Sequence, residues 1–307
     1  MNSFISICIP AYKNTAYLDV LLRSVEIQSF RDFEVIVSDD SPDSEVEMLC
    51  KQYNTKFPLT YHKNSPALGS PANWNMSIKP ATGQWIKLMH DDDWFADENS
   101  LQVFATAAEQ NSDAGFIFSG YSNYENGQLK NTNIPGSFIE NKLKSSPLNL
   151  IAKNYIGHPS NTLIKNNLEL WYDERTKWVV DFEFYIRCLQ TSSFYVIQKP
   201  LINIGIGDEQ ITRAVFNDSA VVIPENLYLL NKMGTGILHN ITVYDHYWRV
   251  FRNLNIRNMA EVEKHAGNNE IPRPIKKMLK LQFKIPLVLL RIGVFSKMLM
   301  AISYYSN

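Results

Sequence analysis

The chain has 307 residues, enough for one large domain or two closely packed units with a sizeable core. Hydrophobic residues make up 45% of it and charged residues 20%, which excludes a disordered chain. The 30 Lys and Arg nearly balance the 31 Asp and Glu, so there is no overall electrostatic basis for binding nucleic acid. Three widely spaced cysteines without a C-x-x-C pattern argue against a disulfide framework or a cysteine zinc site and fit a reducing compartment.

Short apolar runs alternate with helical patterns over the first hundred residues. The apolar runs predict strands over residues 4–9, 33–37, 59–62 and 85–89. Apolar residues at helical spacing predict helices over residues 14–28, 43–53, 71–81 and 101–111. The N-terminal run, which has no basic segment before it, is therefore expected to be a buried strand and not a signal peptide. Strands that alternate with helices predict βαβ units and a mostly parallel central sheet flanked by helices.

The rest of the chain is less regular. The pattern predicts later strands over residues 114–118, 163–164 and 194–197, and a helix over residues 181–190. A stretch rich in Asn, Gly and Ser, residues 121–139, is expected to be a loop, and the chain beyond residue 217 to be helical. We expect an N-terminal half of one domain over residues 1–115, a second half over residues 116–215, and a helical C-terminal region over residues 216–307.

Three predicted strands end in polar residues, at positions 10–12, 38–40 and 90–93. In parallel sheets ligands bind beyond the carboxyl ends of the strands, so these residues are expected to meet at one edge. Consecutive Asp residues at 91–93 repel one another, and a hard divalent cation such as Mg²⁺ or Mn²⁺ would remove that cost. An acidic loop capping the following helix is the structural alternative, as is a simple turn at Asp39–Asp40.

Four sequence elements occur in a specific order along the N-terminal third. They are Pro10-Ala11-Tyr12, Ser38-Asp39-Asp40-Ser41, Ala72-Asn73-Trp74-Asn75 and His90-Asp91-Asp92-Asp93-Trp94. In this order they resemble the family 2 glycosyltransferases, which have a GT-A fold. The resemblance covers residues 3–100 closely and residues 150–200 loosely. The chain differs from the family by one extra residue in the first element, Tyr12-Lys13-Asn14, and by Ser38 before the Asp pair.

The resemblance implies a binding site for a nucleotide-sugar donor, a UDP-sugar or dTDP-sugar. Pro10 and Tyr12 would line the pocket for the base, and Asp39 would accept a hydrogen bond from uracil or thymine. The full set of donor-binding residues implied in this way is Pro10, Ala11, Tyr12, Asn14, Asp39, Asp40, Asn75, Asp91 and Asp92.

The resemblance also implies a DXD-type metal site for Mn²⁺ or Mg²⁺ in the Asp run. Alignment on Trp94 puts the metal-binding Asp at Asp92 and replaces the first Asp of the motif by His90, whereas spacing alone selects Asp91 and Asp93. We expect Asp92 and Asp93 to bind the metal, with Asp91 as the further candidate. A metal there would neutralise the departing diphosphate.

The remaining implied roles lie in the second half of the chain. Asp181, which opens a predicted helix 88 residues after Asp93, corresponds to the catalytic base, with Glu183 as the second candidate. The Glu that usually precedes this base is Val180 here, and a helix N-cap is the structural alternative for Asp181. His158 and Trp178 are expected to bind the acceptor. Residues 208–210 and Arg213 lie where relatives carry a loop near the phosphates.

The C-terminal tail is basic. Residues 272–297 carry seven Lys and Arg and no acidic residue, interleaved with large apolar side chains over residues 272–303. No apolar stretch is long enough to predict a spanning helix. The composition fits a helix that lies in an anionic membrane interface, and the alternative is a helix packed on the protein with a solvated basic face.

These inferences together predict an inverting glycosyltransferase of GT-A fold that acts in polysaccharide biosynthesis. The acceptor would be a hydroxyl of a bacterial-type surface glycan, such as O-antigen, or of a polyprenyl-linked oligosaccharide, at the cytoplasmic face of the plasma membrane. Two alternatives remain at this stage. A sugar nucleotidyltransferase would usually carry a Gly-rich loop after the first strand, which is absent here. A nucleotide-sugar-binding protein without catalysis would not depend on Asp181.

Overall fold

A computed structural model describes residues 3–207 and 218–306 of the chain. The chain divides into two compact units. The first contains residues 1–145, 155–175 and 184–208, and the second contains residues 146–154, 176–183 and 209–307. The boundary between the units falls within helix α7, Val180–Thr191.

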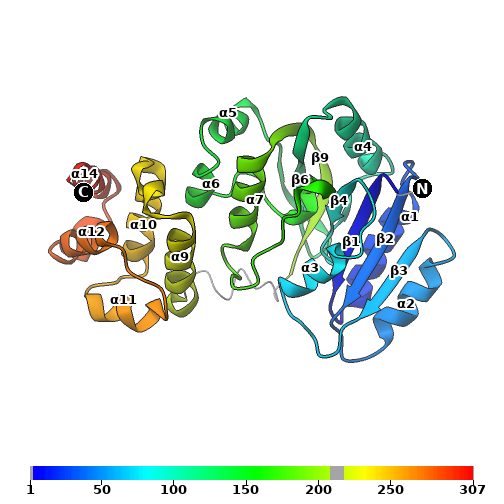
Figure 1. Cartoon of the computed structure of the whole chain (residues 1–307), viewed down its shortest axis with the longest axis horizontal. Helices are drawn as coiled ribbons and strands as arrows, with labels where there is room; N and C mark the ends of the chain where they lie inside the picture. The colour runs from blue at the N-terminus through cyan, green and yellow to red at the C-terminus, as the bar shows by residue number, and fades with distance from the viewer. Residues whose placement is uncertain (1–2, 208–217, 307) are drawn as a thin grey trace. The chain divides into compact units, whose positions relative to one another are not determined.

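The first unit carries all strands of the described residues in one mixed sheet (Figure 1). The strands are β1 (Ile5–Ala11), β2 (Phe33–Asp39), β3 (Leu59–Lys63), β4 (Trp85–Leu88), β5 (Trp94–Phe95), β6 (Ala114–Glu125), β7 (Gln128–Asn133), β8 (Thr162–Lys165) and β9 (Ser193–Ile206). Their order across the sheet is β3-β2-β1-β4-β8-β6-β9-β5, and β7 pairs with β6. The helices of this unit are α1 (Thr15–Glu26), α2 (Glu45–Tyr53), α3 (Ala72–Ile78), α4 (Ser100–Gln110) and α5 (Ser137–Ser145).

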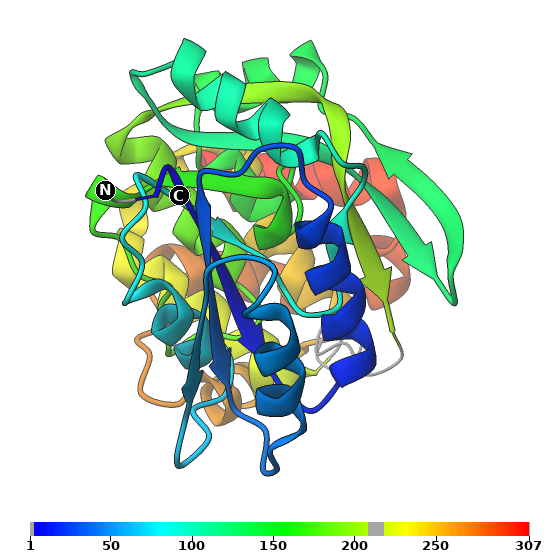
Figure 2. The ribbon, with the colours of Figure 1, turned by 90° about the vertical axis from the view of Figure 1, so that its right-hand side faces the viewer.

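The strands β3, β2, β1 and β4 are parallel, whereas β8 is antiparallel to β4 and β6. Strand β1 is buried along its whole length, as expected for a central strand covered on both faces. Helices α1 and α2 lie on one face of these strands and α3 lies on the other (Figure 2). The predicted α/β fold with a helix-flanked central sheet is confirmed, with the antiparallel strands confined to the second half of the sheet.

The predicted helix over residues 14–28 is α1, and its formation follows from local chemistry. The Asn14 side chain accepts a hydrogen bond from the backbone N–H of Tyr17 (3.2 Å) and so caps the first turn. Leu18, Leu21, Leu22 and Val25 then form the buried face. Asn14 therefore caps α1 in the structure. It was expected to bind the donor, and that contact stays a prediction.

The predicted loop over residues 121–139 is wrong. Strand β6 continues to Glu125, and the turn at Asn126-Gly127, where both residues have positive φ (51° and 74°), returns the chain as β7. Residues 128–132 of β7 are exposed and, apart from Leu129, polar, so the strand shows none of the alternation on which sequence prediction depends. Helix α5 then begins at Ser137.

The second unit is helical in its described residues. Besides the start of α7, its helices are α6 (Asn149–Ala152), α9 (Ser219–Met233), α10 (Ile241–Asn253), α11 (Met259–Ala266), α12 (Arg273–Phe283), α13 (Leu287–Leu290) and α14 (Gly293–Tyr305). Helix α10 is the centre of this unit, because its buried face, which includes Tyr247, Trp248 and Phe251, packs against α6, α12 and α14. No helix in the part of the chain that the structure describes is long and apolar enough to cross a membrane.

Candidate functional site

The ends of β1, β2 and β4 meet at one edge of the first unit. Ala11 pairs with Asp39 where β1 and β2 end, and the backbone N–H of Tyr12 donates a hydrogen bond to Oδ2 of Asp91 (3.1 Å). The predicted convergence of the three polar strand ends is therefore confirmed. Tyr12 is 53% exposed, so its ring is the accessible aromatic surface beside the acidic segment.

Asp39 lies at the end of β2 and is fully buried. Its Oδ1 accepts a hydrogen bond from the N–H of Ser41 (2.7 Å), and its Oδ2 accepts from the Tyr61 hydroxyl (2.7 Å) and from Lys63 Nζ (3.0 Å). The negative charge of Asp39 is thus balanced by Lys63, whose side chain is 35% exposed. The Asp39 carboxylate itself does not reach the surface, and its partners Tyr61 and Lys63 cover it there.

Asp40 orders the loop that follows β3. Its Oδ1 accepts hydrogen bonds from Asn64 Nδ2 (2.8 Å) and the N–H of Leu68 (3.0 Å), and its Oδ2 accepts from the N–H of Gly69 (2.7 Å). The buried carboxylate of Asp40 thus fixes the exposed loop at residues 68–69 against the sheet edge. Asp40 was expected to bind the donor, and that contact stays a prediction.

The acidic segment after β4 brings three potential metal ligands together. One ligand atom each from His90, Asp92 and Asp93 lie within 4.8 Å of one another. The Nε2 atom of His90 is buried and has no hydrogen-bond partner among the described residues. Asp91 is not in this group, since its carboxylate accepts the bond from Tyr12. An imidazole nitrogen and two carboxylates are a donor set suited to Mn²⁺.

The electrostatics of this segment are unfavourable without a cation. Burial, followed by the negative charge of Asp92, raises the pKa of Asp91 to about 7 and raises the pKa of Asp93 well above its usual value. Burial also lowers the pKa of His90 to about 3, so its imidazole is neutral and available as a ligand at physiological pH. A bound divalent cation would favour the charged form of both carboxylates.

A buried lysine supports the segment from β4. Lys87 has no exposed surface, and its Nζ donates hydrogen bonds to the carbonyl oxygens of Ser160 and Thr162. The Ser160 hydroxyl in turn accepts a hydrogen bond from the N–H of His90 (3.0 Å). Burial lowers the pKa of Lys87 well below its usual value, and the negative charge of Asp93 opposes that shift. Lys87 and Ser160 were not predicted as site residues.

Gly205 of β9 is a further residue that the sequence did not indicate. Its N–H donates a hydrogen bond to Oδ1 of Asp93 (3.2 Å), and a Cβ atom at this position would collide with the carbonyl oxygen of Asp92. The backbone of β9 therefore approaches the acidic segment as closely as only glycine permits. A lone glycine within a strand carried no signal for this contact, because the glycine and the Asp run are 112 positions apart.

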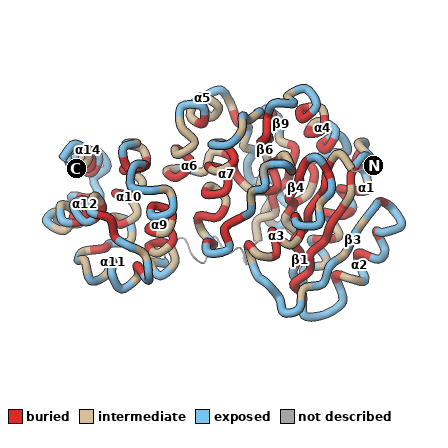
Figure 3. Tube along the Cα trace, viewed as in Figure 1, coloured by how far each residue is buried: buried red, intermediate tan, exposed pale blue. Residues whose placement is uncertain are grey.

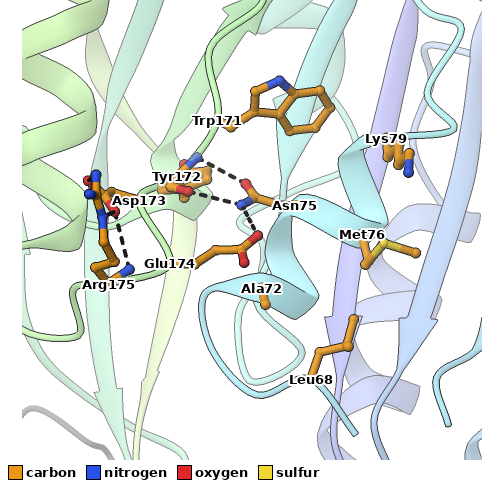
Figure 4. A pocket seen from close by; sticks show the side chains of 10 residues that line it. All are labelled: Leu68, Ala72, Asn75, Met76, Lys79, Trp171, Tyr172, Asp173, Glu174 and Arg175. Atoms are coloured by element: carbon orange, nitrogen blue, oxygen red, sulfur yellow. Dashed lines mark hydrogen bonds and ion pairs between the residues drawn. The ribbon is translucent and has the colours of Figure 1, made fainter. Parts of the chain in front are cut away.

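Asn75 of α3 binds another part of the first unit. Its Nδ2 donates to the carbonyl of Tyr172 and to Glu174 Oε1 (both 2.9 Å), and its Oδ1 accepts from the N–H of Tyr172 (2.9 Å). These bonds close one side of a pocket of about 610 Å³, above which the ring of Trp171 lies (Figure 4). The Asn75 amide, expected near the donor, is used here to hold the segment of residues 171–175.

His158 is partly buried within the first unit. Its ring contacts the Tyr121 ring edge to face (centroids 5.2 Å apart), and burial lowers its pKa to about 4. Its backbone N–H donates to Asn161 Oδ1 (2.8 Å). These contacts are those of a residue that fixes the turn before β8, and its predicted contact with the acceptor stays a prediction.

The two base candidates lie at the start of α7, in the second unit. Burial raises the pKa of Asp181 to about 7. The residue as a whole is partly exposed, but its Oδ1 atom is buried and has no hydrogen-bond partner among the described residues. Glu183 is fully buried and forms an ion pair with Lys232 (2.7 Å). Asp181 is therefore the better suited of the two to accept a proton near neutral pH.

Glu225 of α9 fixes the backbone just before Asp181. Its Oε1 accepts a hydrogen bond from the N–H of Lys177 (2.9 Å), and its Oε2 accepts from the N–H groups of Trp178 (2.7 Å) and Val179 (3.1 Å). A carboxylate that satisfies the free N–H groups at a helix start is strongly favourable. The Trp178 backbone thus has a structural role, and its predicted acceptor contact stays a prediction. Residues 208–210 and Arg213 lie outside the described residues.

Comparisons with known proteins agree with this geometry. An uncharacterized glycosyltransferase of Haemophilus influenzae is 26% identical over 205 residues, which are 64% of this chain and 66% of that protein. The poly(ribitol-phosphate) β-N-acetylglucosaminyltransferase TarS of Staphylococcus aureus is 29% identical over 117 residues, 36% of this chain and 20% of TarS. The chain thus aligns with slightly less than two thirds of the first relative and a fifth of the second.

Solved structures show the same fold. The crystal structure of S. aureus TarS 1–349 in complex with UDP-GlcNAc superposes with a TM-score of 0.67 at 17% identity, over 100% of this chain and 92% of that one. The mannosyltransferase PcManGT from Pyrobaculum calidifontis, in complex with GDP-Man and Mn²⁺, gives a TM-score of 0.56 at 12% identity, over 100% of this chain and 87% of that one. The profile of "Glycosyl transferase family 2" matches residues 6–166, about half of the chain. With these motifs, this sheet and this match, the chain belongs to glycosyl transferase family 2.

Proposed function

We propose that the chain binds a nucleotide-sugar at the carboxyl edge of β1, β2 and β4 and transfers its sugar, with inversion, to an acceptor hydroxyl. The observation that carries this proposal is the hydrogen bond between the N–H of Tyr12 and Asp91. It joins an exposed aromatic ring, suited to stack on a base, to a carboxylate segment suited to hold a metal and its diphosphate. Family membership supports the same reaction class.

The donor in this proposal is a UDP-sugar or dTDP-sugar. The base would lie against Tyr12 and Pro10, near Ala11, and Asp39 would receive the N3–H of the pyrimidine. Asp39 is buried beneath its partners in the structure, so this contact requires Tyr61 or Lys63 to move or to meet the base instead. The TarS complex with UDP-GlcNAc favours a uridine donor, and the PcManGT complex with GDP-Man makes guanosine the necessary comparison.

The residues present fit a divalent metal, Mn²⁺ or Mg²⁺. His90, Asp92 and Asp93 would hold it, because the buried and unpartnered Nε2 of His90 faces the same small space as the two carboxylates. When bound, the metal would stabilise the negative charge that develops on the departing diphosphate. Asp91 would act beside this set by holding the backbone of Tyr12 in place.

Asp181 is the proposed general base. A carboxylate whose pKa is raised to about 7 takes a proton from a hydroxyl more readily than an ordinary Asp does. It would accept the proton of the acceptor hydroxyl as that oxygen attacks the anomeric carbon and the nucleoside diphosphate departs. The ion pair of Glu183 with Lys232 argues against Glu183 in this role.

The proposed acceptor is a hydroxyl of a bacterial-type surface glycan or of a lipid-linked oligosaccharide, with His158 and Trp178 as acceptor contacts. The relative TarS, named for a poly(ribitol-phosphate) acceptor, supports a polymer of this general kind. The location that fits such an acceptor is the cytoplasmic face of the plasma membrane, with peripheral contact through residues 272–303. Family membership favours transfer over a nucleotidyltransferase or a binding protein without catalysis.

A thermal-shift panel of UDP-, dTDP- and GDP-sugars, each with and without Mn²⁺, tests the donor and the metal together. We expect stabilisation by a UDP- or dTDP-sugar that depends on the metal, since a ligand that binds only the folded chain raises its melting temperature. A shift with GDP-sugars alone would contradict the donor assignment. No shift with any donor would contradict the proposed function.

A further inference from the structure

The exposed face of α12 is entirely cationic. Its exposed side chains include Arg273, Lys276, Lys277, Lys280 and Lys284, the last at its C-terminal cap. At 3.6 residues per turn these five positions fall within an arc of about 100°. None of them is paired with a carboxylate among the described residues. Because the whole segment from residue 272 to 307 contains no Asp or Glu, the positive field of this face is uncompensated locally.

A stripe of exposed apolar side chains runs along α14 of the same unit. Val294 is 85% exposed, Met298 52%, Ile302 51% and Tyr305 81%. Their spacing puts them within an arc of about 80°, on the side opposite the buried Ser296, Met300 and Ser303. Val288 and Leu289 of α13 and Ile292, which follows it, are also exposed apolar side chains. Exposed apolar side chains in this number on one short segment indicate a partner.

These faces are held outward by the packing of the unit, as the pale outer surfaces of α12 and α14 show (Figure 3). On the inner side of α14, Trp248 Nε1 donates to Ser296 Oγ (3.0 Å) and the Tyr244 and Ser303 hydroxyls share a hydrogen bond (2.7 Å). These two buried hydrogen bonds lie on the inner side of α14, and turning the apolar stripe inward would break them.

The link between α12 and α13 is fixed as well. The Arg257 guanidinium donates hydrogen bonds to the carbonyl oxygens of Gln282, Phe283 and Ile285. The carbonyls of Gln282 and Phe283 belong to the last turn of α12, and that of Ile285 lies two residues beyond its end. Arg257 therefore caps α12 and fixes the start of the link to α13. The cationic face and the apolar stripe are in this way parts of one rigid arrangement in the C-terminal unit.

We propose that α12, α13 and α14 form a docking surface for an anionic lipid bilayer, which the apolar stripe enters and whose phosphates the cationic face binds. A nucleic acid would meet the cations but leave the apolar stripe uncovered. A second copy of the chain would bring two cationic faces together. An anionic membrane interface satisfies both features at once, because its phosphates meet the cations and its acyl region takes up the apolar side chains. This inference assigns the membrane contact of the proposed function to specific residues. It rests on the proposed function only for the reason why the chain would bind a membrane.

Co-sedimentation of the full chain with lipid vesicles tests the surface directly. We expect binding to phosphatidylcholine vesicles that contain phosphatidylglycerol to exceed binding to phosphatidylcholine alone by at least about tenfold, and to weaken as salt is raised. K276Q/K277Q/K280Q/K284Q should abolish the preference for anionic lipid. V294S/M298S/I302S should lower binding to the anionic vesicles about tenfold, because the inserted apolar area is lost.

Matched variants in the first unit separate this surface from general effects of charge and hydrophobicity. K51Q/K56Q/K130Q/K144Q removes the same number of charges from lysines that are ion-paired with Glu. I27S/M48S/L129S removes three apolar side chains that are 54–58% exposed. Both controls should bind vesicles like the parent chain. Equal loss in the controls and in the α12 and α14 variants would overturn the proposal.

Two further outcomes would also overturn it. Equal binding to both vesicle types would remove the role of the cationic face. A parent chain that is oligomeric in sedimentation velocity, and that becomes monomeric in V294S/M298S/I302S, would make the stripe an interface between copies. Thermal shifts with the nucleotide-sugar donor, measured on the same variants, distinguish failure of the docking surface from failure of the proposed function. Lost lipid binding with an intact donor shift identifies the docking surface, whereas intact lipid binding without any donor shift would count against the proposed function alone.

Discussion

Two acidic segments follow β2 and β4, the strands on either side of β1 in the sheet, and they differ in how their charge is compensated. Asp39 and Asp40, after β2, each accept three hydrogen bonds from the chain itself, and Lys63 pairs with the first of them. After β4, Asp91 accepts one bond from Tyr12, and burial raises the pKa of both Asp91 and Asp93.

This difference indicates two roles. The carboxylates after β2 stabilise the fold, whereas those after β4 are suited to bind a ligand. The charges after β2 are already stabilised by fixed N–H and ammonium groups, so their removal should cost stability. Those after β4 accept hydrogen bonds, Asp91 from Tyr12 and Asp93 from Gly205, and lie beside the unpartnered Nε2 of His90. A cation would stabilise these charges further, so their removal should cost function. In the sequence the two acidic segments look alike. They are distinguished only by their hydrogen-bond and ion-pair partners in the folded chain.

The largest expected effect is on the segment after β4. Asp92→Ala combined with Asp93→Ala should abolish metal-dependent donor binding and lower transfer by about 10³-fold or more, because the developing diphosphate charge loses its counter-ion. Isothermal titration of the donor with and without Mn²⁺ measures the first effect. The protein should stay folded, since a buried carboxylate and the partly buried carboxylate next to it, which repel each other, are removed.

The control is Asp32→Ala with Asp113→Ala, which removes two exposed carboxylates of the same unit. It should leave Mn²⁺-dependent donor affinity unchanged. If the D92A/D93A chain instead kept its metal-dependent affinity, the metal would have to bind elsewhere, and the contrast between the two segments would fail.

Asp181 extends the comparison to the second unit, where another carboxylate has a raised pKa. Asp181→Asn should lower transfer by about 10²–10⁴-fold while leaving donor affinity intact, because only the proton acceptor is lost. In the parent chain kcat/KM should rise with pH up to about 7, the pKa of Asp181, since the base acts only when deprotonated. Full turnover by the D181N chain would exclude the base assignment.

The stability of D181N provides a second, independent measurement. The pKa of Asp181 is higher in the folded chain than in the unfolded chain, so the folded state binds more protons between about pH 4 and 7 and loses stability as pH rises through that window. Removing the titrating group should therefore raise the free energy of unfolding at pH 8, by about 1.4 kcal/mol for each unit by which the pKa is raised, and have little effect at pH 4. An unchanged difference between parent and variant across this range would contradict a raised pKa.

Asp40 tests the other side of the comparison. Asp40→Ala should destabilise the chain by about 3 kcal/mol, because it leaves Asn64 and the backbone N–H groups of Leu68 and Gly69 without their acceptor. The loss should be the same with and without Mn²⁺. Asp43→Ala is the matched control, since the exposed Asp43 accepts a single bond from the N–H of Glu45 and its loss should cost under about 1 kcal/mol. Denaturant unfolding measures both.

Gly205 tests how tightly the acidic segment is held. Gly205→Ala places a Cβ against the carbonyl of Asp92, and because a backbone atom cannot swing aside we expect about 2 kcal/mol of destabilisation and weaker Mn²⁺ affinity. Gly207→Ala, where a Cβ meets nothing within 4 Å, should change neither quantity. Equal behaviour of the two variants would mean that β9 does not constrain the segment.

Sequence patterns correctly predicted the strands that form this edge of the sheet. They did not predict which residues contact the acidic side chains there. Runs such as residues 33–37 are apolar except for Glu34 because both faces of the strand are largely buried, so the first four strands and their common edge follow from pattern alone. The pairing of Asp39 with Lys63, the support of the 90–93 segment by Lys87, and the approach of Gly205 depend on which strands become neighbours. That is decided by tertiary packing, which leaves no local signal.

His90 shows the same limit within a motif. Its position was predicted as a replacement for the first Asp of the metal motif, but its fitness as a ligand depends on burial that keeps the imidazole neutral and leaves Nε2 without a partner. The hairpin formed by β6 and β7 was missed for the opposite reason, since an exposed polar strand has no hydrophobic alternation to detect.

The smallest predicted effect concerns Glu225, which resembles Asp40 in using its carboxylate to satisfy backbone N–H groups. Glu225→Gln replaces one of its two acceptor oxygens by a donor, so at least one of the three N–H groups at residues 177–179 loses its bond. We expect about 1 kcal/mol of destabilisation. Glu263→Gln, an exposed position on α11, is the control and should be neutral.

If Glu225 only stabilises the second unit, kcat and its pH profile should be unchanged in E225Q under conditions where the chain is fully folded. If it also positions the start of α7, kcat should fall several-fold while KM for the donor stays constant, because Asp181 is reached through the backbone that Glu225 fixes. We expect the second result, since the capped N–H groups of Trp178 and Val179 immediately precede the turn that carries Asp181. Glu225, a buried structural carboxylate, would then position Asp181, the proposed catalytic base.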